Sequence, residues 1–188
     1  MDVKDLIYTE NNVLPLSALS SFIKWLNTQD HNFATSQLAG NVVDKSIRKV
    51  QDFTLLKNTK SQTEIHWLNF LLHNFIKGID NYQKKFKVNT GIVKALEVTV
   101  LKYTNSSHYK YHIDHGGTTP RTLSLIYLCN NDYEGGDLVF GSVDQSKEIL
   151  RIKKEANKLI IWPSNFIYPH KVEPVTKGTR YSIVSWSL

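Results

Sequence analysis

The chain has 188 residues and a single cysteine, Cys129, so no disulfide can form within it. A lone cysteine fits a reducing compartment, and we therefore expect a cytoplasmic protein. No apolar run approaches the roughly 20 residues that a membrane-spanning helix needs. The opening residues, MDVKDLIYTE, also lack the basic patch and apolar core of a secretory signal. The sequence thus predicts no membrane partner.

The sequence also lacks a long cluster of residues that carry the same charge. The net charge is +6, but the basic residues are scattered in short runs such as NYQKKFK and LRIKKE. A solvated surface explains such runs better than a nucleic-acid partner does. A modest positive field would still favour the approach of an anionic ligand.

Helical periodicity is confined to the N-terminal half. Leu19, Phe22, Ile23 and Leu26 predict a helix that is capped by Ser17 and ends near Thr28. A second helix should open at Thr63 and Glu64, with Gly78 as a weak point. Its expected buried stripe is Ile65, Leu68, Leu72, Phe75, Ile76, Ile79 and Tyr82. We expect an irregular lead-in or edge strand over residues 1–15, and loops with two short strands over residues 33–56.

The C-terminal half consists of short β-rich segments separated by turn residues such as Gly135-Gly136. Many short strands without an intervening helical segment predict a jelly roll. The predicted strands are Ala95–Tyr103, Tyr109–Asp114, Thr122–Leu128, Asp137–Phe140, Leu150–Ile152, Lys158–Trp162, His170–Val175 and Arg180–Ser187. We therefore expect one domain over residues 1–188, of α+β class but mainly β. A double-stranded β-helix (jelly roll) over residues 94–188 would be buttressed by the helices and short strands of residues 1–93.

Chemistry-bearing residues gather at His112-Ile113-Asp114, within the stretch YTNSSHYKYHID. In an extended strand alternate side chains share a face, so His112 and Asp114 should point the same way. Two histidines and one carboxylate form the facial triad of non-haem Fe(II) oxygenases. The best third ligand is His170, which Arg180 follows ten residues later. A His-x-Asp triplet alone is a weak signal, and chance in a surface strand is its alternative.

Three ordered blocks between residues 96 and 188 make the signal stronger. The first contains two tyrosines six residues apart, Tyr103 and Tyr109, followed by the His-x-Asp triplet. The second is RTLSLIYLCNNDYEGGDLVF, and the third is PHKVEPVTKGTRYSIVSW. Together they resemble the catalytic domain of 2-oxoglutarate/Fe(II) dioxygenases of the prolyl 4-hydroxylase type.

The resemblance implies that His112, Asp114 and His170 bind Fe(II) and leave positions open for 2-oxoglutarate and O2. Arg180 would pair with the far carboxylate of 2-oxoglutarate, because a guanidinium stays charged and forms two parallel hydrogen bonds to a carboxylate. A surface salt bridge is the plainer role for Arg180. These four residues are the expected catalytic set.

Other residues receive roles from the same resemblance. Tyr103 would hydrogen-bond the cosubstrate, Ser124 would lie near its far carboxylate, and Tyr109 would shape the entrance or the substrate side. If residues 180–186 form a strand, Trp186 shares a face with Arg180 and would wall the pocket. Core packing for Tyr103 and an ordinary strand position for Ser124 are the alternatives.

The implied function is hydroxylation of a prolyl residue in a peptide or protein, with succinate and CO2 as co-products. Ascorbate dependence is implied only by the resemblance. The short connection HGGTTP, and Leu128 where oxygen-sensing members carry a second tyrosine, leave the substrate open. The same iron chemistry could act on another side chain, a free amino acid or a small metabolite. A non-catalytic jelly-roll binding module is a further reading, and a nucleic-acid demethylase ranks low because no second arginine follows Arg180.

Overall fold

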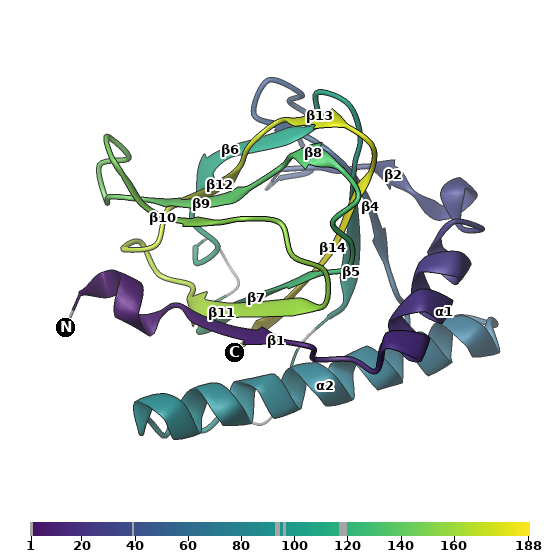
Figure 1. Cartoon of the computed structure of the whole chain (residues 1–188), viewed down its shortest axis with the longest axis horizontal. Coiled ribbons are helices and arrows are strands. Elements are labelled where there is room, and N and C mark those ends of the chain that lie inside the picture. The colour runs from purple at the N-terminus through teal and green to yellow at the C-terminus, as the bar shows by residue number, and fades with distance from the viewer. Residues whose placement is uncertain (1, 39, 93–94, 96, 117–119) are drawn as a thin grey trace.

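Two antiparallel sheets face each other, and two α-helices lie outside the larger sheet (Figure 1). The computed structural model describes residues 2–38, 40–92, 95, 97–116 and 120–188. The larger sheet has seven strands in the order β1-β11-β7-β14-β5-β4-β2, and the smaller has five in the order β10-β9-β12-β6-β3. This arrangement confirms the mainly β, jelly-roll fold class.

The elements have the following bounds. The larger sheet contains β1 (Tyr8–Asn11), β2 (Ala34–Thr35), β4 (Gln51–Thr54), β5 (Thr99–Tyr103), β7 (Leu123–Leu128), β11 (Lys158–Pro163) and β14 (Arg180–Ser187). The smaller contains β3 (Arg48–Lys49), β6 (His108–His112), β9 (Leu138–Gly141), β10 (Glu148–Ile152) and β12 (His170–Val172), while β8 (Glu134–Gly135) pairs with β13 (Val175–Lys177). The helices are η1 (Val3–Leu6), α1 (Leu16–Leu26), η2 (Asp30–Asn32) and α2 (Gln62–Phe86).

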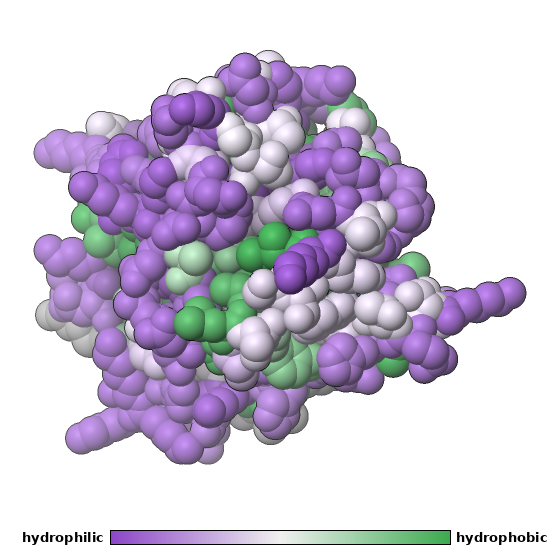
Figure 2. Space-filling view, turned by 45° about the vertical axis from the view of Figure 1, so that its right-hand side comes forward, coloured by the Kyte–Doolittle hydropathy of each residue, from purple (hydrophilic) through white to green (hydrophobic). Residues whose placement is uncertain are grey.

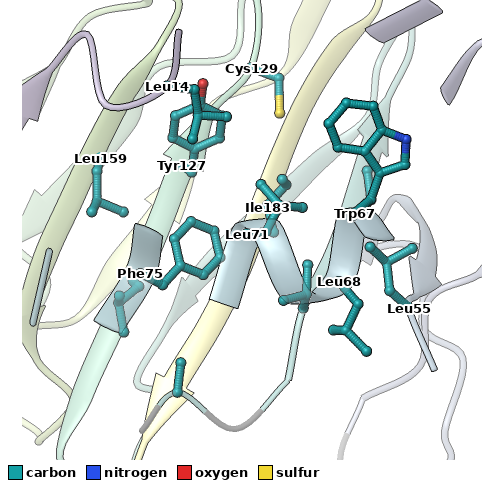
Figure 3. Close-up of a cluster of buried hydrophobic side chains, with 14 of the residues drawn as sticks. Leu14, Leu55, Trp67, Leu68, Leu71, Phe75, Tyr127, Cys129, Leu159 and Ile183 are labelled. Atoms are coloured by element: carbon teal, nitrogen blue, oxygen red, sulfur yellow. The ribbon is translucent and has the colours of Figure 1, made fainter. Parts of the chain in front are cut away.

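Strand alternation divides the apolar residues between two cores. On β14, Tyr181 and Ile183 face the helices, whereas Val184 faces the other sheet. The core under the helices also contains the lone cysteine, Cys129, and Leu71 and Phe75 of α2 (Figure 3). The helices therefore bury one face of the larger sheet, and its other face is left to line the space between the sheets.

The N-terminal half contributes to both sheets. It supplies the edge strand β1, which was expected for residues 1–15, and three short strands where two were predicted. Strands β2 and β4 extend the larger sheet, and β3 extends the smaller. The predicted boundary between residues 93 and 94 lies outside the described residues, as do residue 96 of the predicted strand from Ala95 and residues 117–119 of the HGGTTP connection.

The start of α1 differs from the prediction. Pro15 occupies the N-cap position and its carbonyl accepts a hydrogen bond from the amide of Leu19, 3.0 Å away. Ser17 therefore lies in the first turn, and its assignment as the N-cap is wrong. Proline suits the start of a helix because its fixed φ is already close to the helical value.

Helix α2 begins where expected, since the hydroxyl of its N-cap, Ser61, accepts from the amide of Glu64. Its buried face is rotated from the predicted stripe. Four of the seven residues of that stripe are buried, but Ile76 is 39% exposed. The face that packs is Glu64, Trp67, Leu68, Leu71, Phe75, Gly78, Ile79 and Tyr82. Gly78 contributes because it brings the helix backbone close to β11, where a Cβ would overlap the side chain of Leu159.

The surface is mixed in character. Figure 2 shows a face that is mostly hydrophilic, with hydrophobic residues gathered near its centre. None of the helices in the described part of the chain is both long and apolar enough to cross a membrane.

We predict that Gly78→Val lowers the free energy of unfolding by about 2–3 kcal/mol, because overpacking against Leu159 outweighs any gain in helix propensity. Lys77→Val, at an exposed position of the same helix, is the matched control and should cost under about 1 kcal/mol. Urea denaturation of both variants measures the difference. Equal losses would show that the close approach of α2 to β11 does not limit the residue at position 78.

Candidate metal centre

The two candidate histidine ligands lie opposite each other on adjacent strands. Strand β12 pairs with β6 so that His170 faces His112 across the ladder. Asp114 does not share an extended strand with His112, as the alternation argument required, because β6 ends at His112 and Asp114 lies in a bend. The bend nevertheless brings its carboxylate to both imidazoles.

The three side chains converge on one point. Asp114 Oδ1 lies 3.7 Å from His112 Nε2, and Asp114 Oδ2 lies 3.6 Å from His170 Nε2. One ligand atom from each of the three residues lies within 4.8 Å of the others. Bonds of about 2.1 Å to a shared ion place two ligand atoms at most about 4.2 Å apart, so the carboxylate–imidazole separations suit a metal better than a hydrogen bond.

The remaining ring nitrogens fix the tautomers. His112 Nδ1 lies 2.9 Å from the carbonyl of Lys110, and His170 Nδ1 lies 3.1 Å from the carbonyl of Tyr168. A carbonyl only accepts, so each Nδ1 carries the proton and donates it. Each Nε2 then presents a lone pair towards Asp114, which is the orientation that metal-binding histidines usually have.

Electrostatics favour a neutral imidazole at His112 and an ionised carboxylate at Asp114. Loss of solvation and the neighbouring His170 lower the pKa of His112 to about 3. Burial opposes ionisation of Asp114, but the two histidines, together with hydrogen bonds from Ser124 and Trp186, hold the pKa of Asp114 below its usual value. At neutral pH the cluster therefore offers two nitrogen lone pairs and one anionic oxygen, the donor set for Fe(II).

A β-bulge places Tyr109 beside the histidines. His170 pairs with His112 but Val172 pairs with Tyr109, so β6 carries one extra residue between the two pairs. The bulge turns Tyr109 and His112 to the same side, although they are three residues apart. Their rings stack with centroids 3.5 Å apart and planes at 13°. Strict alternation in the sequence could not have predicted this contact.

The first residue of β14, Arg180, has a buried guanidinium. Arg180 is paired with Tyr103 of β5, is 1% exposed, and has its Cζ 4.8 Å from the centre of the Tyr103 ring. Arg180 Nη1 donates to Ser182 Oγ at 2.7 Å. Arg180 Nε, Arg180 Nη2 and the Tyr103 hydroxyl are buried and have no hydrogen-bond partner among the described residues.

These unpaired donors fit an anionic ligand. An isolated buried charge is costly unless it is paired, so Arg180 requires a carboxylate that the described residues do not supply. Burial raises the pKa of Tyr103, although Arg180 opposes the effect, so its phenol remains a donor. Arg180 does not itself line the cavity that Tyr103 lines, and it lies behind the tyrosine ring.

Ser124 is not near Arg180, contrary to the role expected for it. Ser124 pairs with Trp186, six residues along β14 from Arg180, a separation of roughly 20 Å. Its hydroxyl lies 2.8 Å from that of Ser164, and Ser124 helps to lower the pKa of Asp114. A serine in strand β7 could not be assigned to either end of the site before the register of β7 with β14 was known.

A cavity of about 600 Å³ opens onto the three ligands. Trp186 and Val184 form part of its wall, and Tyr103 and Tyr109 also line it. Two arginines that had been given no role, Arg48 and Arg121, line it as well. Arg48 precedes the His-x-Asp triplet by more than 60 residues, and no pattern in the sequence connects it with the site.

A jelly roll that carries two histidines and a carboxylate between its sheets defines a mononuclear non-haem iron type of site. Residues 98–188 match the family model of the 2OG-Fe(II) oxygenase superfamily. All three candidate ligands and Arg180 fall inside the match. This part of the chain is therefore similar in sequence to the superfamily.

The similar curated proteins are PKHD-type hydroxylases. A PKHD-type hydroxylase of Gloeothece citriformis is 35% identical over 91 residues, which are 45% of this chain and 39% of that protein. The PKHD-type hydroxylase PiuC of Pseudomonas aeruginosa is 32% identical over 95 residues, 45% of this chain and 40% of its own. The chain thus covers about two fifths of the length of these curated relatives.

Solved structures share the fold over nearly the whole chain. A prolyl hydroxylase from Trichoplax adhaerens, in complex with a hypoxia inducible factor oxygen degradation domain peptide fragment, has a TM-score of 0.76 at 21% identity. The alignment covers 97% of this chain and 83% of that one. A prolyl-4-hydroxylase from Pseudomonas putida has a TM-score of 0.73 at 18% identity and covers 98% and 96% of the two chains. The chain thus resembles 2-oxoglutarate/Fe(II) enzymes of the prolyl hydroxylase type.

We predict that His112→Ala weakens binding of Co²⁺, a stable substitute for Fe(II), by at least about 100-fold, because one of three ligands is lost. Anaerobic titration calorimetry measures the affinity. His108→Ala is the matched control, since His108 is on the same strand but its ring nitrogens face the carbonyls of Ser106 and Ser46. Unchanged Co²⁺ affinity in His112→Ala would remove this histidine from the centre.

Proposed function

We propose that this protein is an Fe(II)- and 2-oxoglutarate-dependent dioxygenase that hydroxylates a prolyl residue in a peptide or protein. The observation that carries the proposal is the combination of the His112–Asp114–His170 cluster with the unpaired buried donors of Arg180 and Tyr103. The superfamily match, the PKHD-type relatives and the prolyl hydroxylase folds support the same chemistry.

In this proposal the cluster holds Fe(II) through two neutral imidazoles and one carboxylate. When iron, 2-oxoglutarate and O2 are bound, the chemistry that they supply is oxidation of 2-oxoglutarate to succinate and CO2, coupled to hydroxylation of a C–H bond. Arg180 and Tyr103 bind and orient the far carboxylate of 2-oxoglutarate. Trp186 walls the cavity, excludes water and hydrogen-bonds Asp114, and Tyr109 covers one face of His112. Ascorbate would serve only to keep the iron reduced.

The target is proposed from the solved neighbours. One was solved with a peptide, as its name states, and the cavity here is open to the surface next to β3 and β6. The same iron chemistry acting on a small metabolite is the second candidate. A cytoplasmic location is also part of the proposal, and the free thiol of Cys129 supports it.

The hydroxylase proposal predicts succinate release that depends on Fe(II) and is stimulated by a proline-containing peptide, with a one-oxygen mass gain on proline. Coupled succinate detection and peptide mass spectrometry measure the two products. Peptides with alanine in place of proline are the control. Stimulation by free amino acids or metabolites alone would transfer the function to the second candidate.

For Arg180→Lys we expect the Kd for 2-oxoglutarate to rise about 10–100-fold, because lysine cannot form the two parallel hydrogen bonds. The affinity for Co²⁺ should stay within about threefold, since no metal ligand changes. Titration of 2-oxoglutarate into the Co²⁺-loaded protein gives the first value. Arg151→Lys is the control, because Arg151 forms only surface ion pairs with Glu148, Asp137 and Glu173. Equal changes in the affinities for metal and 2-oxoglutarate would contradict the role of Arg180.

A further inference from the structure

Two arginines line the cavity close to the metal ligands. Arg48 of β3 has its Cζ 4.8 Å from the ring centre of Tyr109, whose other neighbour in the stack is His112. Arg121 has its Cζ 3.7 Å from the ring centre of Trp186. Aromatic contact holds each guanidinium plane at the cavity wall, so both cations are positioned before any substrate binds.

Both guanidinium groups have N–H donors that are available to hydrogen-bond a ligand. Arg48 Nη1 donates to the Gln37 carbonyl at 2.9 Å, while Arg48 Nε is buried and has no partner among the residues that the structure describes. The carboxylate nearest to Arg48, Asp52, is 4.0 Å from Nη2 and also accepts a hydrogen bond from Ser36. Within the described part of the chain the guanidinium of Arg121 donates only to the Asp114 carbonyl, at 3.3 Å, and forms no ion pair.

Within the cavity lining these cations are in excess, since the Asp52 carboxylate near Arg48 lies outside it. Asp114 is the sole carboxylate among the described residues of the lining. The two positive charges of a divalent ion would balance dianionic 2-oxoglutarate, and the charge of Arg180 would balance that of Asp114. Arg48 and Arg121 are then left to act on the remaining ligand, and a partly desolvated site strengthens that attraction.

The rim favours a polypeptide over a small molecule. Ile113 lines the cavity and is 42% exposed. Leu38 also lines it and forms a bridge with Val42, which is 54% exposed, and Val43 beside it is 48% exposed. Apolar side chains that extend beyond the cavity on the β2–β3 side can bury residues of a longer chain that flank the reacting one.

We propose that the substrate is an acidic polypeptide segment whose carboxylate side chains flank the hydroxylated residue, with one flank bound by Arg48 and the other by Arg121. This inference rests on the proposed function and narrows its substrate class. Arg48 contacts Tyr109, which stacks on His112, and Arg121 donates to the Asp114 carbonyl, so a chain that passes over the iron can meet both arginines.

The test compares fluorescent proline-centred peptides that carry glutamate on the N-terminal flank, on the C-terminal flank, or glutamine at both. Fluorescence anisotropy measures binding to protein loaded with Co²⁺ and an unreactive 2-oxoglutarate analogue. We expect each glutamate peptide to bind about 10–100-fold more tightly than the glutamine peptide. The preference should shrink as salt is raised from 0.05 M to about 0.5 M.

Substitutions of the two arginines show which arginine binds the acidic residue on each side of the proline. Arg48→Gln should abolish the preference for acid on one flank and Arg121→Gln on the other, whereas Arg48→Lys and Arg121→Lys should keep most of it. Arg151→Gln is the matched control and should keep both preferences, because Arg151 lies outside the cavity lining. If Arg151→Gln weakens the preference as much as the other two, a general positive field is responsible and the proposal is overturned.

Succinate release separates the two proposals. Equal turnover of glutamate and glutamine peptides would overturn the acidic substrate and leave the hydroxylase standing. Acid-selective binding without succinate from any peptide would overturn the hydroxylase and uphold the acidic partner. Displacement of both glutamate peptides by free proline would assign the arginines to an amino-acid carboxylate, and this too would overturn the polypeptide proposal.

Discussion

The pairing of β12 with β6 is the constraint on which the candidate site depends. Antiparallel register places His170 opposite His112 and fixes their separation through backbone hydrogen bonds rather than through the side chains. Each imidazole ring is then oriented by a hydrogen bond from its Nδ1 to the backbone carbonyl two residues earlier. Because the backbone sets the positions and the tautomers, the cluster can form before any ion is bound.

The second constraint is the burial of charge between the sheets. Arg180 is almost fully buried, and two of its nitrogens and the Tyr103 hydroxyl beside it have no partner in the part of the chain that the structure describes. Folding by itself gives no reason to retain such an arrangement, since an apolar pair of similar size would pack there at lower cost. The proposed carboxylate ligand gives a reason, because it would satisfy the donors that the fold leaves open.

Much of the architecture could be predicted from the sequence. Turn residues and β-rich segments gave most strands of the C-terminal half, and the spacing of apolar residues gave both helices. The limits appeared where a neighbour decides the outcome. The buried face of α2 includes Gly78 because β11 approaches the helix there. The N-cap of helix α1 is Pro15 rather than Ser17, because the chain already has a near-helical φ at that proline.

By itself the sequence determined the chemical types of the site: two histidines, a carboxylate and a late arginine, in an order that resembles a known family. The tertiary structure alone decided which other side chains join them. A bulge turns Tyr109 onto His112, strand register moves Ser124 away from Arg180, and the edge strand β3 brings in Arg48. The reason is physical. Local periodicity says which face of an element a residue occupies, but the register between strands that are distant in sequence decides what that face meets.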